Sequence, residues 1–421
     1  MGGSATTQRS TPQPTPADLL DRGRAAGLAA VGITSAAIQQ PAREILHLRR
    51  RAGRAGTMQF TYRNPDRSTD PTSVLPSARS IIVGAWAYGQ WRAPDTPADP
   101  GGSAEQSAGS GSGRVARYAW HDHYGDLRAA LETMAEPLRR AGHKAVVVAD
   151  GNGLVDRNAA WSAGLGWYGK NSNLLLPGAG SWFVLGAVVT NADLNSPEPV
   201  RPQADGCGSC HRCLDDCPTG AIVAPGVVDA TRCLAWLVQA DGEFPRRWRV
   251  ELGDRLYGCD DCQDVCPPNR QPAQPSTDDR AGEDRQADRQ QVEVELDWVL
   301  TATDDEILDR HGRWYIAGRN VDNVRRSALV VLGNVAEPGT GDPIGLLRRY
   351  LDSSNPVLRG HAVWAARRLG LTALASAAAD DPDPDVRSEL DGEVVARFGP
   401  ADWDLDVTAV TDASGTDPGD R

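Results

Sequence analysis

The stretch CGSCHRCLDDCP, residues 207–218, places four cysteines within eleven positions and ends in proline. The spacing C-x2-C-x2-C-x3-C-P is the one with which bacterial ferredoxins hold an iron–sulfur cluster. Thiolates are soft ligands that suit iron. In ferredoxins with two clusters the fourth cysteine of this run ligates the other cluster. A second set of cysteines is therefore expected.

The second set is present. Cys259, Cys262 and Cys266, followed by Pro267, give C-x2-C-x3-C-P, and Cys233 is the remaining cysteine of the chain. The swapped pattern predicts two [4Fe-4S] clusters that use all eight cysteines. Cluster one takes Cys207, Cys210, Cys213 and Cys266, and cluster two takes Cys217, Cys233, Cys259 and Cys262. The alternative is a pair of zinc sites with four thiolates each, although zinc ribbons usually present two separate C-x2-C knuckles.

Length and composition indicate a soluble protein. A chain of 421 residues has room for two or three domains and buries an ample core without disulfides. No charged and then apolar leader begins the chain, and no apolar run approaches the roughly 18 residues of a membrane span. We expect a cytoplasmic monomer with no membrane partner. In such a reducing compartment, closely spaced cysteines are more often metal ligands than disulfides.

The net charge of −12 is unevenly distributed. Residues 371–421 contain 13 acidic and 3 basic residues, which leaves −2 for the rest of the chain. Residues 313–368 contain 9 arginines against 4 acidic residues. The overall acidity argues against a polyanionic partner, but this basic segment is compatible with one.

Alternating helical and strand patterns before residue 200 predict an α/β layer architecture, and the whole chain reads as an α+β multidomain protein. Ser77–Tyr88 and Lys144–Asp150 have the apolar, β-branched character of buried strands, and residues 124–142 repeat apolar residues at helical spacing. The predicted parts are a disordered N-terminus at 1–16, an α/β domain at 17–200 with a flexible loop at 92–113, a two-cluster ferredoxin-like domain at 201–270, a linker at 271–291, a helical domain at 292–395 and an acidic tail at 396–421.

The helical domain contains a recurring phrase. NPVLR at 355–359 and DPDVR at 383–387 lie 28 residues apart among short helical segments. This pattern is typical of HEAT-type repeats, although the period is short for that class. The alternative is two unrelated helix starts that share a turn.

Candidate functional residues lie upstream of the cysteines. GLGWYG, residues 164–169, matches G-x-G-x-x-G, but it follows a helical stretch and precedes a strand-like one, so it does not predict a dinucleotide site. Its glycines would instead let the backbone lie against a flat ligand. Asp150 ends a strand-like run, where burial beside an apolar cofactor would suit a general acid. The local sequence alone favours an Asx-turn residue that starts the next helix.

Other candidates are weaker. Lys170 and Asn171 could bind a phosphate or an amide, or could be ordinary polar loop residues. Asp122, His123 and Tyr124 could form a metal site, but neighbouring residues with a single histidine are more often ordinary polar residues of the surface or the core. DRHGRW at 309–314 nearly matches the cobalamin motif D-x-H-x-x-G, but Trp314 stands where glycine is required.

With these residues assembled, the chain resembles the epoxyqueuosine reductases, iron–sulfur and cobalamin enzymes that complete the queuosine base in tRNA. This family is related to the reductive dehalogenases. The resemblance spans roughly residues 60–335. It rests on RVARYA (114–119), the strand-end Asp150, AGLGWYGKN (163–171), GSWFVLG (180–186), CGSCHRCLDDCPTGAI (207–222), YGCDDCQDVCP (257–267) and LGN (332–334).

The resemblance implies base-off cobalamin between the α/β domain and the ferredoxin module, with no protein histidine below the cobalt. It implies that Asp150 is the proton donor and that an external donor supplies electrons. The implied cobalamin contacts are Arg67, Lys170, Asn171, Ser172, Gly180 and Ser181. A HEAT-like segment that grips the anticodon arm of a tRNA with a modified wobble base would use Arg319, Arg325, Arg326 and Arg359.

The chain departs from the family's usual pattern at Gly153, at residues 238–240 and at Pro268. Two other functions therefore stay open. One is a corrinoid reductase of small molecules such as organohalides, and the other is a non-enzymatic electron carrier. Salt-sensitive affinity for tRNA would separate the tRNA-modifying reductase from the small-molecule reductase. An electron carrier would contain iron and sulfide but no cobalt.

Overall fold

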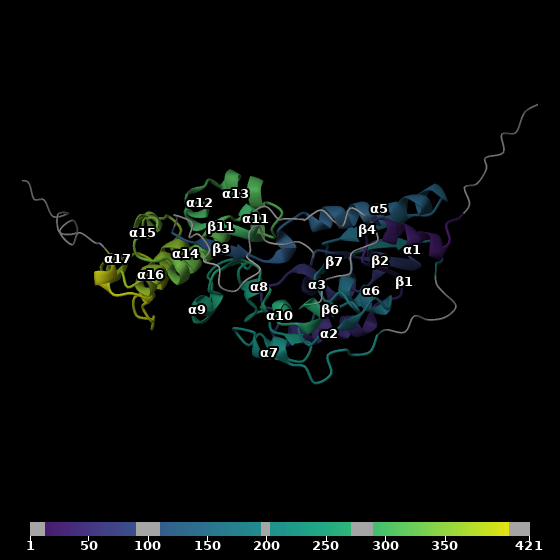
Figure 1. Ribbon diagram of the computed structural model, residues 1–421, viewed down its shortest axis with the longest axis horizontal. Helices are drawn as coiled ribbons and strands as arrows, with labels where there is room; N and C mark the ends of the chain where they lie inside the picture. Colours follow the sequence, from purple (N-terminus) through teal and green to yellow (C-terminus); the bar gives the residue numbers. More distant parts are fainter. Residues whose placement is uncertain (1–12, 90–109, 195–202, 271–288, 404–421) are drawn as a thin grey trace, which may run out of the picture.

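The computed structural model describes residues 13–89, 110–194, 203–270 and 289–403. The molecule is elongated: a sheet domain lies at one end, a helical domain at the other, and the cysteine module lies below and between them (Figure 1). None of the helices in these ranges has the length and hydropathy that a bilayer crossing requires.

The first domain is built on a four-stranded antiparallel sheet in the order β1-β2-β7-β4. Its strands are β1 (Ala30–Ser35), β2 (Ser80–Ala87), β7 (Phe183–Thr190) and β4 (Ala145–Ala149). Helices α1 (Pro16–Ala25) and α5 (His123–Arg140) pack on one face, and α6 (Asp156–Ser162) packs on the other. The predicted layer architecture is confirmed, with a fully antiparallel sheet.

Helix α5 packs directly against two glycines of this sheet. Gly84 of β2 faces Gly186 of β7, and a Cβ on either residue would stand within about 3.1 Å of Leu131 in α5. The helix begins where the Asp122 carboxylate accepts a hydrogen bond from the Gly125 amide at 3.0 Å. The paired glycines therefore make room for the apolar face of the helix.

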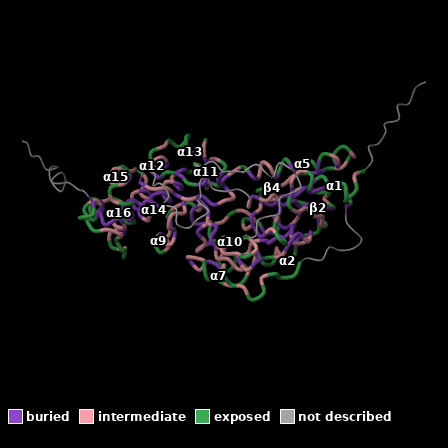
Figure 2. The backbone as a smooth tube through the Cα atoms, viewed as in Figure 1, coloured by how far each residue is buried: buried purple, intermediate pink, exposed green. Residues whose placement is uncertain are grey.

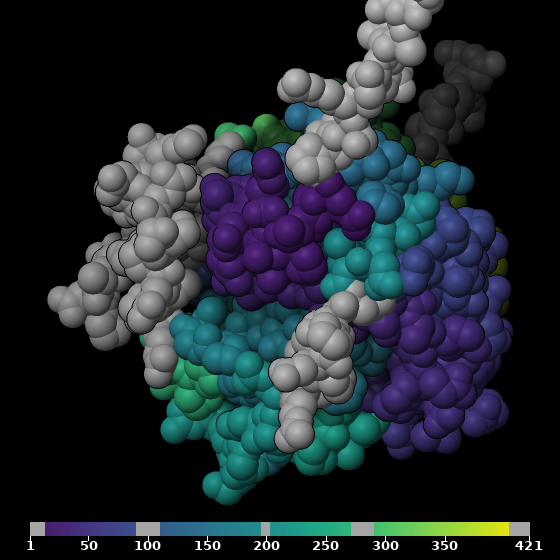
Figure 3. All heavy atoms as spheres, turned by 90° about the vertical axis from the view of Figure 1, so that its right-hand side faces the viewer, coloured from purple at the N-terminus to yellow at the C-terminus, as the bar shows by residue number. Residues whose placement is uncertain are grey.

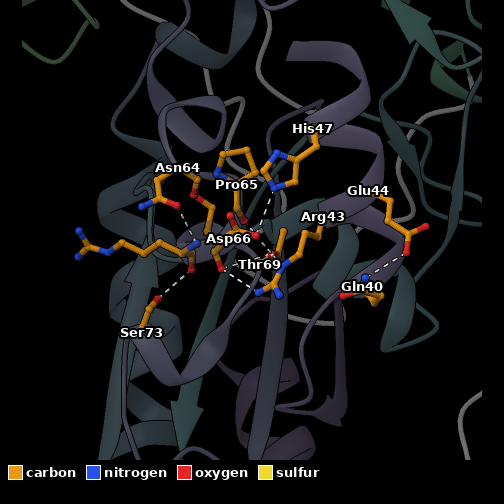
Figure 4. A network of polar contacts seen from close by, with 11 residues as sticks. Gln40, Arg43, Glu44, His47, Asn64, Pro65, Asp66, Thr69 and Ser73 are labelled. Carbon is orange, nitrogen blue, oxygen red and sulfur yellow. Dashed lines mark hydrogen bonds and ion pairs between the residues drawn. The ribbon is translucent and has the colours of Figure 1, made fainter. Parts of the chain in front are cut away.

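Short elements connect β1 to β2 along the chain. They are α2 (Gln40–Arg51), α3 (Phe60–Arg63), α4 (Pro65–Ser68) and η1 (Pro71–Ser73). A polar network fastens α2 to this segment (Figure 4). Arg43 donates to the Asp66 carbonyl and to the Thr69 hydroxyl, each at 2.9 Å, and His47 Nε2 lies 3.2 Å from Asp66 Oδ1. The remaining elements of this half are β3 (Ser112–Val115), η2 (Arg117–Ala119), β5 (Trp167–Tyr168) and β6 (Leu174–Leu175).

The cysteine module consists of short helices and a small hairpin. Its elements are α7 (Arg212–Asp215), β8 (Ile222–Ala224), β9 (Val227–Val228), α8 (Leu234–Leu237), η3 (Arg246–Trp248), α9 (Arg249–Leu252), β10 (Arg255–Tyr257), α10 (Asp261–Asp264) and η4 (Pro267–Arg270).

A second sheet joins three parts of the chain. Strand β3 lies between β10, with which it pairs in parallel, and β11 (Glu293–Glu295), with which it pairs antiparallel. The prediction of a flexible loop through residue 113 is wrong at its end, because Ser110 is buried against Asp297 and residues 112–113 belong to β3. Residues 92–109 of that loop lie outside the described residues.

The C-terminal domain is helical. Its elements are α11 (Arg289–Val292), α12 (Leu296–Thr301), α13 (Asp304–His311), η6 (Ala317–Arg319), α14 (Asp322–Val335), α15 (Pro343–Leu351), α16 (Pro356–Arg368), α17 (Thr372–Ser376), α18 (Pro384–Ser388) and η7 (Pro400–Asp402). The two recurring phrases start helices in the same way: Asn355 caps α16 and Asp383 caps α18, each followed by proline. Buried stretches run along α14 and α16 (Figure 2).

One hydrophobic core runs from the cysteine module into the helical domain and includes Val115, Phe244, Leu329 and Trp364. The start of the expected acidic tail belongs to the fold instead, because Trp403 is buried in this core and donates to the Leu369 carbonyl at 2.8 Å. Residues 404–421 and most of the expected N-terminal disorder lie outside the described residues.

Candidate functional site

A cavity of about 460 Å³ lies between the sheet domain and the cysteine module. Viewed from the sheet end, N-terminal residues in purple adjoin residues of the middle of the chain in teal (Figure 3). Much of the cavity wall is aromatic, with rings from α3, from the sheet end and from the cysteine module. These rings are Phe60, Tyr62, Tyr88, Tyr118, Tyr124, Phe183 and Trp236. Such a lining suits a large, flat, largely apolar ligand.

The lining residues divide the eight cysteines into two sets. Cys217, Cys233, Cys259 and Cys262 all line this cavity. Cys207, Cys210, Cys213 and Cys266 all line a second, smaller cavity of about 20 Å³. These are the two sets that the swapped ferredoxin pattern predicts. Cys266 lies with Cys207, Cys210 and Cys213, whereas Cys217, which follows those three in the sequence, lies with the other set. The geometry supports the predicted ligand sets.

The environment of the thiols fits this division. Burial, together with the neighbouring Cys207 and Cys213, raises the pKa of Cys266 to about 11. Burial raises the pKa of Cys262 well above its usual range, with Cys259 and Cys233 as further causes. Binding of metal would displace these protons, since thiolates are the ligands.

No three Cys, His, Asp or Glu side chains of the described residues converge closely enough to hold a single metal ion.

Lys170 holds the first cysteine loop. Its ammonium donates to the carbonyls of Gly208 at 2.7 Å and Cys210 at 2.8 Å, and it lines the smaller cavity. The structure thus places Lys170 against the cysteine set predicted for cluster one, outside the larger cavity. Its positive charge would offset the negative charge of a thiolate-ligated cluster.

Asn171, Ser172 and Ser181 line the larger cavity. Asn171 Nδ2 donates to the Cys262 carbonyl at 3.2 Å, and Ser172 Oγ donates to the Gly226 carbonyl at 2.7 Å. Both side chains therefore tie the sheet domain to the cysteine module.

Gly180 is not among the residues that line either cavity. Its φ is +65°, and a Cβ there would stand 1.9 Å from Asn269 Oδ1. Only glycine allows this approach of the Asn269 side chain.

Asp150 adopts the left-handed conformation, with φ +53°. Its side chain is exposed and is not among the residues that line the larger cavity, whereas the neighbouring Tyr124 and Asp156 are. Partial burial raises the pKa of Asp150, and the nearby Arg128 opposes this effect. The expectation of an Asx-turn residue that starts the next helix is wrong, because α6 begins only at Asp156.

The structure also changes the expectations for the GLGWYG glycines and for Arg67. A Cβ at Gly166 or Gly169 would collide with Leu175 of the adjoining strand β6, so these two glycines allow a close approach within the protein, and Gly169 also lines the smaller cavity. Arg67 is exposed and lines neither cavity.

Several residues of the wall had no assigned role in the sequence. Asp260 is buried, and its Oδ2 accepts a hydrogen bond from the Arg117 amide at 2.8 Å. Burial raises the pKa of Asp260 to about 6. Gln239 donates to the Tyr118 hydroxyl at 3.0 Å. The motifs RVARYA and YGCDDC contain Arg117, Tyr118 and Asp260 without giving their function, and Gln239 lies among the departures at residues 238–240.

The four candidate RNA-binding arginines differ in exposure. Arg319 is exposed. Arg325 is mostly buried and forms ion pairs with Asp304 and Asp322. Arg359 pairs through both sides of its guanidinium with Asp381.

Arg326 is wholly buried, and its guanidinium donates to four carbonyls of the cysteine module. Two of these belong to Leu237 and Val238, at the end of α8. The expectation that Arg326 contacts RNA is therefore incompatible with this structure.

Three protein-family models match the chain. The model described as 4Fe-4S double cluster binding domain matches residues 206–269, the model described as Epoxyqueuosine reductase QueG, DUF1730 matches residues 68–156, and the model for HEAT repeats matches residues 316–391. The repeat predicted from the two phrases is confirmed.

Curated relatives are similar over most of the chain. The epoxyqueuosine reductase of Bacillus cereus is 32% identical over 320 residues, which cover 74% of this chain and 79% of the relative. That of Xanthomonas campestris is 32% identical over 378 residues, which cover 87% of this chain and 100% of the relative.

Solved structures of epoxyqueuosine reductases are also similar to this chain. A crystal structure of epoxyqueuosine reductase with an epoxyqueuosine-modified tRNA-Tyr stem loop has a TM-score of 0.76 at 28% identity, covering 89% of this chain and 96% of that one. The Bacillus subtilis epoxyqueuosine reductase, solved with its catalytic aspartate loop swung out of the active site, has a TM-score of 0.74 at 28% identity, with the same coverage.

Proposed function

The chain belongs to the epoxyqueuosine reductase family, and from this premise we propose that it reduces epoxyqueuosine at the wobble position of tRNA to queuosine, using cobalamin that its two [4Fe-4S] clusters reduce. The observation that carries this proposal is the larger cavity. One wall holds the four cysteines predicted to ligate cluster two, and the other walls hold aromatic and polar residues of the sheet domain.

The positions of the two cysteine sets suggest a direction for electron flow. Gly208 and Ser209, in the loop of the first set, are exposed, whereas the second set faces the cavity. The exposed loop of the first set would therefore be the side that an external electron donor reaches, and the second set would face the electron acceptor in the cavity. Interleaved ligands keep the two clusters close together, which favours transfer of single electrons.

The cavity lining is compatible with a corrinoid. No histidine is among the described residues that line it. Asn171, Ser172 and Ser181 offer amide and hydroxyl groups for the polar rim of the ring. When bound, cobalamin supplies a strong two-electron reductant in a site that excludes water.

Asp150 is the proposed proton donor. Opening the epoxide to an alkene consumes two electrons and two protons and releases water, and the departing oxygen must be protonated. The raised pKa of Asp150 keeps a larger fraction of its carboxyl protonated. Since Asp150 lies outside the cavity lining here and the corresponding loop of a relative is described as swung out, we propose that residues 150–153 move inward with substrate.

The helical domain would hold the anticodon arm. Arg319 is exposed on it, as are Arg313, Arg348 and Arg349. Contacts from these side chains to phosphates would release counterions, so affinity for tRNA should fall steeply as salt rises.

The test is anaerobic reconstitution with iron, sulfide and cobalamin, followed by metal analysis and an assay on tRNA that carries epoxyqueuosine. We expect iron and cobalt in the protein and formation of queuosine, which mass spectrometry of digested tRNA detects as the loss of one oxygen. Protein that contains both metals but leaves epoxyqueuosine unchanged would refute the proposed substrate. Protein that takes up iron but no cobalt would refute the proposed reductant.

A further inference from the structure

A cluster of three aromatic rings extends from the cavity wall to the protein surface. Phe60, from α3, lies 6.1 Å from Trp236 of α8 and 4.7 Å from Tyr315, measured between ring centroids. Trp236 and Tyr315 are 6.3 Å apart. The three rings come from the sheet domain, the cysteine module and the helical domain, so all three parts of the chain meet here.

The rings form a gradient of exposure. Phe60 and Trp236 line the cavity, and Trp236 is buried. Tyr315 is 36% exposed. Of the Phe, Tyr and Trp side chains in the described residues, only Tyr168 is more exposed, and its ring neighbour Trp161 does not line the cavity. Tyr315 is thus the exposed ring that touches the cavity wall.

The backbone holds Tyr315 in place independently of its side chain. The Tyr315 amide donates to the Tyr257 hydroxyl at 2.7 Å, and Tyr257 stacks on Trp314 with ring centroids 4.3 Å apart. Substitution of the Tyr315 side chain should therefore leave the local backbone intact. An aromatic ring kept exposed on a fixed backbone offers a flat face to a ligand.

The surroundings of the ring cluster are basic. Residues 49–63 contain five arginines and no acidic residue, and residues 310–321 contain three arginines and no acidic residue. Arg54 lines the cavity, and Arg313 and Arg319 are exposed. Positive charge beside an exposed aromatic face is the combination by which proteins hold single-stranded RNA.

We propose that Tyr315, backed by Phe60 and Trp236, is the platform on which an unpaired base beside the modified nucleotide stacks. This inference rests on the proposed function. A wobble base that enters the cavity loses its stacking partner in the anticodon loop, and its neighbour must then find another flat surface. Arg54, which lines the cavity, and Arg319, which is exposed, would contact the phosphates that flank that base.

The test uses the full-length reconstituted enzyme and stem loops that carry epoxyqueuosine, with 2-aminopurine placed on one side of the modified nucleotide or the other. Tyr315→Leu removes the aromatic face and keeps apolar bulk, and Tyr315→Phe keeps the face. Val395→Ala, at a 71% exposed position remote in the sequence from all three rings, is the control. Circular dichroism and iron content establish that each variant is folded.

We expect Tyr315→Leu to raise KM for the stem loop about 5- to 100-fold, with kcat little changed, because stacking of one base on an aromatic ring has about that effect. The wild-type enzyme and Tyr315→Phe should quench 2-aminopurine on one side of the modified nucleotide, and Tyr315→Leu should not. An unchanged KM and quench in Tyr315→Leu, or an equal loss in Tyr315→Phe, would overturn the platform. A wild-type enzyme that neither binds nor converts the stem loop would instead overturn the proposed function.

Discussion

Asn269 binds both the backbone and the side chain of Ser181. Its Oδ1 accepts the Ser181 amide at 2.6 Å, and its Nδ2 donates to Ser181 Oγ at 2.9 Å. Ser181 lines the cavity, while Asn269 follows the last cysteine by three residues. This contact fixes the cysteine module against the sheet domain at the edge of the site.

Gly180→Ala should break this contact. The new methyl group would meet Asn269 Oδ1 at 1.9 Å, and the φ of +65° disfavours a side chain. We expect a lower thermal midpoint and weaker retention of cobalamin, the latter measured by equilibrium dialysis. Gly178→Ala is the matched control, because Gly178 also has positive φ but nothing lies within 4 Å of its Cβ position. Equal effects of both substitutions would show that backbone strain, and not the Asn269 contact, is responsible.

The cross-ligation of the clusters predicts a pattern in double variants. Cys266→Ala and Cys210→Ala should each reduce the iron content by about half, because each removes a ligand of cluster one. The combination Cys266→Ala/Cys210→Ala should lose no more iron than either single variant. Cys266→Ala/Cys259→Ala should lose nearly all of it, since Cys259 is assigned to cluster two. The opposite pattern would mean that Cys266 belongs with Cys259.

Asp150→Asn should abolish most of the activity without harming the fold. Asparagine tolerates the left-handed conformation that φ +53° imposes, so the loop should keep its shape. Loss of the proton donor should lower kcat about 10²- to 10⁴-fold with iron and cobalt contents unchanged. A decrease below about threefold would exclude Asp150 as the donor.

The pH dependence gives a separate test of this role. The protonated carboxyl is the active form of a donor, so kcat should fall as pH rises through the raised pKa of Asp150. This limb of the profile should be missing in Asp150→Asn, whose residual rate stays flat over the same range. Persistence of the limb in the variant would assign it to another group.

The features that sequence spacing specifies directly were predictable. The cysteine run, the second set and the repeat phrases are local patterns with a physical reason for their spacing, and the strand before Asp150 and helix α5 follow hydrophobic periodicity. The cavity wall was not predictable in this way. Phe60, Trp236 and Tyr315 meet only after three domains pack, and no local pattern records that contact.

Charge counts also could not separate surface arginines from structural ones. Arg359 and Arg387 occupy equivalent positions in the two repeat phrases, and each donates to the carbonyl six residues before it. They stabilise the turns that begin the helices. A signal was available for Arg326, because the run SALVVL that follows it is apolar on all sides and thus predicts a buried helix.

Arg326 and Arg319 should therefore respond in opposite ways to substitution. Arg326→Met leaves several buried carbonyls of the cysteine module without a donor, which should cost about 3 kcal/mol or more and lower the thermal midpoint. Arg326→Lys should rescue little, because an ammonium cannot reproduce the planar fork. Arg319→Ala should leave stability almost unchanged and weaken tRNA binding with a reduced salt slope, since Arg319 is exposed. Thermal melts and salt-dependent binding of the same variants distinguish the two roles. A stable Arg326→Met variant with a reduced salt slope would restore Arg326 as an RNA contact.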